Sequence, residues 1–277
     1  MKILPVLLCS LAGAIPCLVA EPAADASNEV TAVSSRVFNG YERTRRPDGS
    51  FKPETYGFAV GGPIDGTTTG LEKAPPSATS DSSIDSIRFT HIELAIEGPL
   101  KAEGYLPTTE PRDADLLIVV FWGRTIGTNA FAQSFAESGA LVGGDIDAVD
   151  AHNAKLLGFD SSHAFDRGFD DPTNMMANIR RQVYSGIRDA VGEDRYFVIL
   201  QAYDFPHAWK NHQAKKLWET RYSMTQRGHD FGQDLPRMTL VAAHYFGQES
   251  NGLQMRPIPA GQVNVGDVKS LGEIPQK

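Results

Sequence analysis

The sequence contains very little cysteine. Its only two cysteines, Cys9 and Cys17, both lie within residues 1–20. If that segment is removed, disulfide bonds, thiolate metal sites and cysteine nucleophiles are excluded together. Any chemistry of the mature chain must then come from other residue types.

Residues 1–20 have the features of a secretory signal peptide. Lys2 is followed by an apolar run, and small residues close the segment at Ala20. We expect cleavage after Ala20 and export to the periplasm or cell envelope. The alternative is lipid attachment at Cys17, although Pro16 directly before this cysteine fits a lipoprotein signal poorly.

Long hydrophobic runs and positive charge are also scarce. No later segment approaches the ~18 consecutive apolar residues of a membrane span, so we expect none in the mature chain. The chain has 26 Lys and Arg against 34 Asp and Glu, a net charge of −8. The densest basic cluster is small: Arg43, Arg45 and Arg46. Because an acidic protein repels phosphate backbones, nucleic acid is not an expected partner.

The remaining chain divides by composition into three parts. Residues 21–35 have no periodicity and are predicted to be a flexible leader. Residues 36–249 are predicted to form a single domain, with a Gly-rich insertion at 123–172. Residues 250–277 are predicted to be an irregular tail, with one short strand at Gln262–Val265.

Apolar runs and alternation predict the strands. Leu116–Trp122 and Tyr196–Tyr203 are apolar on both sides of the pleat, which is typical of central strands covered on both faces. Lys215–Gln226 alternates. Shorter extended segments are predicted at Val37–Arg45 and Glu54–Val60, before a long loop at 61–83. We expect four side chains to be buried in adjacent central strands: Leu117, Val119, Val198 and Leu200.

Helical periodicity predicts three main helices. They cover residues 84–100, 172–191 and 234–246, with a shorter helix near Asp147–Leu157. The predicted caps are Asp81 or Ser83, Asp171, and Asp234, and His91 is placed on a buried face. The element order predicts an α/β fold, or α+β as the alternative. It has a mixed sheet of four to five strands, three main helices and a long insertion after a central strand.

Three stretches together resemble a known family. They are Gly104-Tyr105 with the following strand through Val119, Val198–Asp204, and Lys216–Arg221 with its tryptophan. They are similar to the exported bacterial family called domain of unknown function 4136, whose members are often lipoproteins. The resemblance covers about half of the mature chain and implies a compact α/β domain of the cell envelope. It implies no catalytic residue.

Two groups of polar residues suggest metal ions. Asp204, His207 and His212 have side chains that suit zinc, but their spacing matches no helical ligand motif, so they are weak candidates in a polar hairpin. The aspartates at 145, 147 and 150 do not fit a calcium loop, because Val149 stands at the fifth place. We therefore expect no metal and no other cofactor.

The turn after the Leu116–Trp122 strand is a candidate contact. Arg124, Thr125 and Thr128 follow a buried strand, where open α/β sheets often bind ligands. The turn lacks the Gly and Lys pattern of a phosphate loop. A plain turn is the simpler interpretation, and contact with a ligand or partner is the alternative.

The remaining motifs favour structure over catalysis. Ser161-Ser162-His163 offers a nucleophile beside a base, but neighbours in sequence rarely face each other. Glu219 and Arg221 share one strand face and predict a structural ion pair. The aromatic residues Phe121, Trp122, Trp209 and Trp218 are predicted to pack in the core or a hairpin.

These observations favour a non-enzymatic envelope domain that binds a protein, glycan or lipid. The alternative is a hydrolase or metal-dependent enzyme whose site is built by the 123–172 insertion. Residues 127–170 are expected to be dispensable for folding but needed for binding, since their apolar residues are scattered and long loops are often functional.

Overall fold

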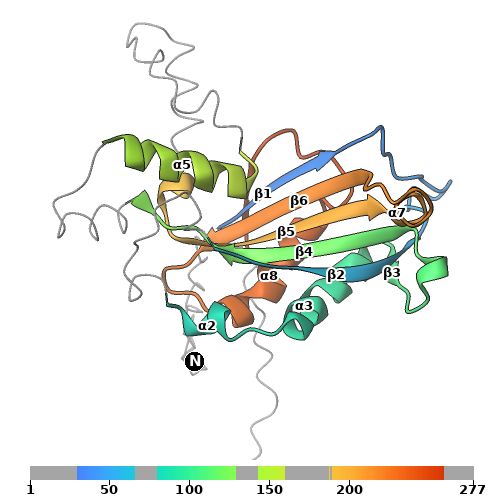
Figure 1. Ribbon diagram of the computed structural model, residues 1–277, viewed down its shortest axis with the longest axis horizontal. Helices are drawn as coiled ribbons and strands as arrows, with labels where there is room; N and C mark the ends of the chain where they lie inside the picture. Colours follow the sequence, from blue (N-terminus) through green and yellow to red (C-terminus); the bar gives the residue numbers. More distant parts are fainter. Residues whose placement is uncertain (1–29, 66–79, 129–142, 160–186, 188, 259–277) are drawn as a thin grey trace, which may run out of the picture.

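In a computed structural model, the chain is described over residues 30–65, 80–128, 143–159, 187 and 189–258. These residues form a seven-stranded mixed sheet of order β3-β2-β4-β5-β6-β1-β7, with helices on both faces (Figure 1). The strands are β1 (Val30–Val37), β2 (Glu54–Asp65), β3 (Tyr105–Pro107), β4 (Leu116–Arg124), β5 (Arg195–Asp204), β6 (Lys216–Thr225) and β7 (Gln254–Pro257). The helices are α2 (Ser82–Asp85), α3 (Phe89–Ala102), α5 (Gly143–Leu157), α7 (Phe205–Asn211) and α8 (Phe231–Ala243), with a 3₁₀ turn at Pro111–Asp113.

The strands pair in two ways. β2 runs parallel to β3 and β4, while the β4–β5, β5–β6, β6–β1 and β1–β7 pairs are antiparallel. The parallel step from β2 to β4 is connected through α3, as a parallel crossover requires. The mixed α/β class is therefore confirmed, and the sheet is larger than the four to five strands expected from the sequence.

The main core lies between the sheet and the pair α3 and α8, and this side of the sheet is called the helical face below. Ile118, Val120 and Leu200 project from the strands toward these helices and are fully buried. Trp218 of β6 stacks on Phe246 after α8, with ring centroids 5.9 Å apart. Large aromatic side chains at this interface bury much apolar area and dominate its stability.

A second, smaller core lies on the opposite side, called the α5 face below. Ala154 and Leu157 of α5 pack against Phe197 and Ile199 of β5, with Phe121 of β4 beside them. Strand residues alternate between faces, so β4 and β5 supply side chains to both cores. Part of the 123–172 insertion thus belongs to the packed structure, which argues against the expectation that residues 127–170 are dispensable for folding.

Two of the four side chains expected in the core are less buried than predicted. Val198 and Leu200 are fully buried, as predicted. Leu117 and Val119 are only partly buried, because they point to the α5 face, where α5 covers one end of the sheet. The continuous apolar sequence of β4 predicts equal cover on both of its faces.

The predicted flexible leader 21–35 is wrong in its last part. Residues 30–35 form most of β1, which lies between β6 and β7, and Val33 is fully buried. The hydroxyl of Ser35 lies 2.7 Å from that of Thr220 and also donates to the carbonyl of Tyr245. Small polar residues can line a central strand when neighbouring strands satisfy their hydrogen bonds. The strand's own sequence does not show whether its neighbours supply these hydrogen bonds.

The helix boundaries also shift. The predicted 84–100 helix is two elements, α2 and α3, and the carboxylate of Asp81 caps the first by accepting from Ser83 N. His91 is exposed on α3. The last helix is capped by Asp230, not by Asp234, which instead pairs with neighbouring basic side chains.

Some predictions lie partly or wholly outside the described residues. Most of the 172–191 helix and the Gln262–Val265 strand fall there. Within the described residues the last strand is β7, inside the predicted irregular tail, and β2 extends to Asp65, inside the predicted loop. No helix among the described residues is both long enough and apolar enough to cross a membrane.

Candidate functional site

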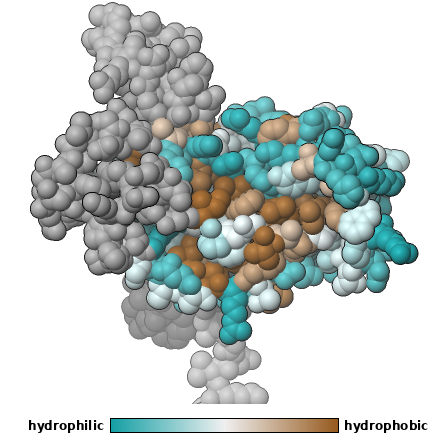
Figure 2. Space-filling model, viewed as in Figure 1, coloured by the Kyte–Doolittle hydropathy of each residue, from teal (hydrophilic) through white to brown (hydrophobic). Residues whose placement is uncertain are grey.

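The α5 face of the sheet combines apolar and charged side chains. Figure 2 shows hydrophobic residues in a band across this face, with hydrophilic residues around it. The partly buried Leu117 and Val119 of β4 lie on this face. Next to them in the sheet, β5 and β6 carry polar groups, and these groups form one connected network.

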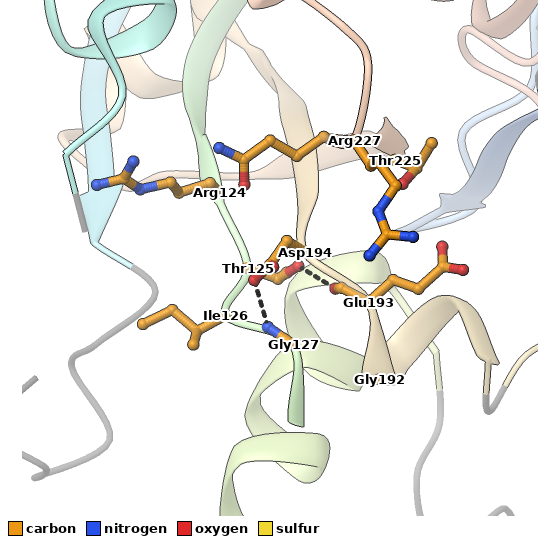
Figure 3. A pocket seen from close by; sticks show the side chains of 10 residues that line it. Arg124, Thr125, Ile126, Gly127, Gly192, Glu193, Asp194, Thr225 and Arg227 are labelled. Carbon is orange, nitrogen blue, oxygen red and sulfur yellow. Dashed lines mark hydrogen bonds between the residues drawn. The ribbon is translucent and has the colours of Figure 1, made fainter. Parts of the chain in front are cut away.

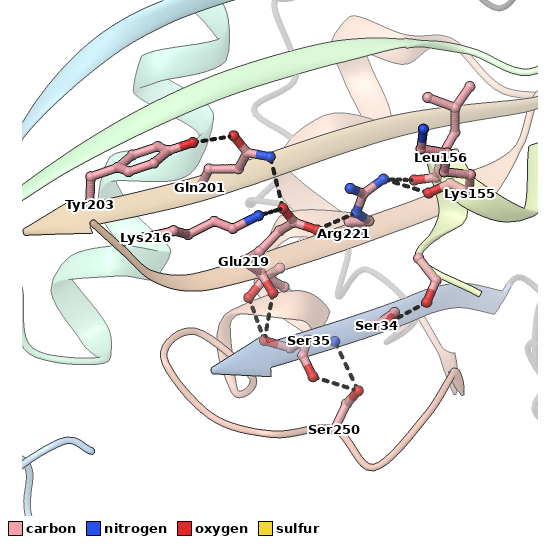
Figure 4. A network of polar contacts seen from close by, with 12 residues as sticks. Ser34, Ser35, Lys155, Leu156, Gln201, Tyr203, Lys216, Glu219, Arg221 and Ser250 are labelled. Carbon is pink, nitrogen blue, oxygen red and sulfur yellow. Dashed lines mark hydrogen bonds and ion pairs between the residues drawn. The ribbon is translucent and has the colours of Figure 1, made fainter. Parts of the chain in front are cut away.

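The network is centred on Glu219 of β6 (Figure 4). Its carboxylate accepts hydrogen bonds from Gln201 at 2.7 Å, Lys216 at 2.8 Å and Arg221 at 2.6 Å. Tyr203 donates in turn to Gln201 at 2.8 Å. The Glu219–Arg221 ion pair predicted from the sequence is confirmed. It lies within a larger network that the sequence did not reveal.

The ion pairs keep Glu219 charged. Burial raises the pKa of its carboxyl group, but Arg221 and Lys216 outweigh this effect and hold the pKa below its ordinary value. Because Glu219 already accepts three hydrogen bonds and stays ionised at neutral pH, it is poorly suited to act as a general base or acid there.

Arg221 also joins the sheet to the end of α5. Its Nη1 donates to the carbonyl oxygens of Lys155 and Leu156, which lie in the last turn of the helix. A cation at this position complements the negative end of the helix dipole. The hydroxyl of Ser34 on β1 donates to the carbonyl of Gly158 at 2.9 Å.

Gly158 is needed where α5 meets the sheet. Its φ is +78°, and a Cβ at this position would lie 2.8 Å from Ser34 Oγ and 2.9 Å from Arg221 Cδ. The helix end and the sheet therefore approach too closely for any other residue without local movement. This contact fixes the position of α5 above β1 and β6.

A pocket lies at this junction and is called the α5 pocket below. It has a volume of about 420 Å³, with a floor formed by β1 and β6 and a wall formed by the end of α5. Its charged lining residues are Arg36, Lys155, Glu219 and Arg221, and Phe38 and Phe159 add apolar surface. Sequence reasoning missed Arg36 and Lys155, which are isolated in sequence and belong to no motif.

A second pocket lies at the ends of β4, β5 and β6 and has a volume of about 570 Å³ (Figure 3). Arg124 and Thr125, two of the predicted contact residues, line it, but Thr128 does not. Thr125 is buried; its hydroxyl donates to the carbonyl of Glu193 and accepts from Arg195 N. Thr128 donates to Gly192 O at 3.4 Å. Thr125 and Thr128 thus hold the turn in place.

The arginines of this second pocket do not converge. In Figure 3 the side chains of Arg124 and Arg227 extend in different directions. Asp194 accepts a hydrogen bond from Gly127 N at 2.7 Å, and Glu193 pairs with Arg195 at 3.3 Å. The acids here are used to hold the turn, and no common ligand position is evident between the two arginines.

The weak metal candidates do not come together. Asp204 caps α7 by accepting from His207 N, the ring of His207 bonds Asn211, and His212 ends the helix with φ +52°. The segment is a short helix, not the predicted open hairpin loop. Across the described part of the chain, no group of three or more His, Cys, Asp or Glu side chains is arranged to hold a metal ion.

The other predicted residues have mixed outcomes. Asp150 lies on α5, as do residues 145 and 147, and Ser161-Ser162-His163 lie outside the described residues. Trp122 and Trp218 are buried in the main core, as predicted. Trp209 is 70% exposed on α7, beside Phe205 in the β5–β6 connection.

Comparison with known proteins identifies no family. No protein-family model and no curated protein matches the chain. Among solved structures, the chain is similar to a PDZ domain protein from Parabacteroides distasonis, with 12% sequence identity and a TM-score of 0.39. The match covers 84% of this chain but only 40% of that one, so the chain spans less than half of its length.

Proposed function

We propose that this chain is an exported protein of the cell envelope that acts as a non-enzymatic binding domain. Export is supported by the signal-like residues 1–20 and by the partial resemblance to an exported family of unknown function. The likeness to a solved structure is too distant to add to this proposal.

The observation that carries the binding role is the state of the polar groups on the α5 face. The acid at its centre, Glu219, is held charged by three donors and has no proton to exchange near neutral pH. Beside it, the α5 pocket presents Arg36 and Lys155 without any ion pair among the described residues. This combination suits the recognition of a ligand better than its chemical conversion.

Processing tests the export part of the proposal. We expect the mature protein to begin near Glu21 and to carry no free thiol, since both cysteines precede that residue. Fractionation of cells followed by intact-mass measurement provides the readout. A full-length chain in the cytoplasm would refute export, and a diacylglycerol adduct on Cys17 would instead identify a lipoprotein.

Capture from envelope extracts tests the binding part. Immobilised mature protein should retain a defined component, and the Arg36→Gln/Lys155→Gln double variant should retain less of it. A double variant of two exposed cations outside the pocket, Arg112→Gln/Lys210→Gln, provides a control of equal charge. Equal retention by all three proteins would refute binding through this pocket, and turnover of the retained component would refute a non-enzymatic role.

A further inference from the structure

We propose that the α5 pocket binds a single phosphate group, held between Arg36, Lys155 and the open edge of the Arg221 guanidinium. This inference rests on the proposed binding function and names the ligand chemistry of the same site. The group could belong to a soluble phosphate compound or to a lipid head group, because the same oxygen atoms would be recognised in both.

The charge balance of the pocket supports an anionic ligand. Glu219 is the one acid among the described lining residues, and it is compensated by Arg221 and by Lys216 beside the pocket. Arg36 lies directly opposite Glu219 in the β1–β6 pair, but neither it nor the ammonium of Lys155 forms an ion pair among the described residues. The pocket is therefore locally positive in a chain whose net charge is −8.

The arrangement of donors favours phosphate. Nε of Arg221 is held by Glu219 and Nη1 by the last carbonyls of α5, so the guanidinium is fixed in orientation. Its Nη2 has no hydrogen bond within the described structure and can donate to a ligand (Figure 4). A fixed guanidinium beside two exposed cations can satisfy several oxygen atoms of one phosphate.

The same contacts reduce the repulsion that an anion would meet at this place. The end of α5 carries partial negative charge on its free carbonyl groups, which would repel phosphate. Arg221 covers the carbonyls of Lys155 and Leu156, and Ser34 covers that of Gly158. The carbonyls nearest the pocket are thus already hydrogen-bonded, while the side chains of Arg36 and Lys155 form no hydrogen bond or ion pair among the described residues.

Calorimetric titration of the mature protein with inorganic phosphate is the first test. We expect saturable binding that weakens with added salt, and at least tenfold weaker binding by the Arg36→Gln/Lys155→Gln variant. The Arg112→Gln/Lys210→Gln control should bind as the unaltered protein does. Both substituted pairs are exposed, so thermal unfolding should show that both variants fold.

Vesicle flotation distinguishes the two sources of the phosphate. Phosphatidylglycerol vesicles test for an anionic lipid head group, compared with phosphatidylcholine vesicles, in which the positive charge of choline neutralises the phosphate. Selective binding to phosphatidylglycerol that the pocket variant loses supports a lipid source, and saturable binding of inorganic phosphate without vesicle binding supports a soluble one. The proposal is overturned if neither probe binds, or if the pocket variant binds as well as the control.

These measurements separate the inference from the proposed function. Both use purified protein and do not depend on export. Phosphate binding by a chain that proves to be cytoplasmic would leave this inference standing and refute the envelope assignment. Capture of a ligand through other residues by an exported protein would refute this inference and leave the envelope assignment standing.

Discussion

The two faces of the sheet differ in how they are closed. On the helical face, α3 and α8 cover the strands, and Ile118, Val120 and Leu200 are fully buried. On the α5 face, the described residues supply one helix, which covers one end, and Leu117 and Val119 of the same β4 strand are only partly buried. The comparison indicates that the helical face holds the larger core and that, among the described residues, the α5 face leaves more of its strand side chains accessible.

The largest expected effect comes from neighbouring residues on opposite faces of β4. Ile118→Ala should lower the free energy of unfolding by about 2–5 kcal/mol, because it leaves a cavity in the main core. Leu117→Ala should cost about 1 kcal/mol, since the leucine is already partly exposed. Urea unfolding measures both. Equal losses would show that the α5 face is as well covered as the helical face.

The next effect concerns the contribution of α5 to folding. Leu157 is 2% exposed and packs in the second core, so Leu157→Ala should cost about 2–3 kcal/mol, at the lower end for a buried leucine. Leu94→Ala on α3 is the control, because Leu94 is 72% exposed and should cost little. If both variants unfold at the same urea concentration as the unaltered protein, α5 is not part of the cooperative fold.

A smaller effect should appear at the junction of α5 and the sheet. Gly158→Ala combines a positive φ with contacts below 3 Å and should cost about 2 kcal/mol. Gly228→Ala has a similar φ of +80° but no atom within 4 Å, so it should cost only the conformational part, about 1 kcal/mol. Thermal unfolding of the two variants isolates the contact. Equal losses would mean that the helix end can move away from Ser34.

The smallest expected effect is the pH dependence of the Glu219 network. The pKa of Glu219 is lower in the folded chain than its ordinary value of 4.5, so ionisation stabilises the folded state above that pH. Glu219→Gln should therefore cost about 1–2 kcal/mol at pH 7, and the difference should shrink as the pH falls below about 4.5. Urea unfolding at several pH values, with the exposed Glu110→Gln as control, measures it. A difference independent of pH would show that packing, not charge, is responsible.

The sequence predicted the strongest elements well. β4 and β5 have continuous apolar runs, and β6 alternates cleanly, with Trp218 and Tyr222 both buried on the predicted common face. The helix near Asp147–Leu157 is also present, as α5. These elements carry their signal within a few consecutive residues, because burial of one face sets the spacing of apolar side chains.

The candidate site was harder to predict. Glu219 and Arg221 are two residues apart on one strand, so their pairing follows from the pleat. Arg36 and Lys155 are both more than 60 positions away from that pair in the sequence, and no local pattern connects them to it. Arg124, Thr125 and Thr128 are predicted as a ligand or partner contact from their place after a strand. In the structure, the hydroxyl groups of Thr125 and Thr128 instead hold the turn.

The sequence by itself determined the central strands, the acidic character of the chain and the absence of cysteine after Ala20. Only the tertiary structure decided that β1 is a buried strand, which face of β4 is covered, and that α5 ends above Arg221. The physical reason is that the spacing of apolar residues along one helix or strand shows only which of its own side chains are buried. Contacts between segments far apart in the chain decide which neighbour covers a face and which one satisfies the hydrogen bonds of a strand of small polar residues. They also decide which distant cations come together.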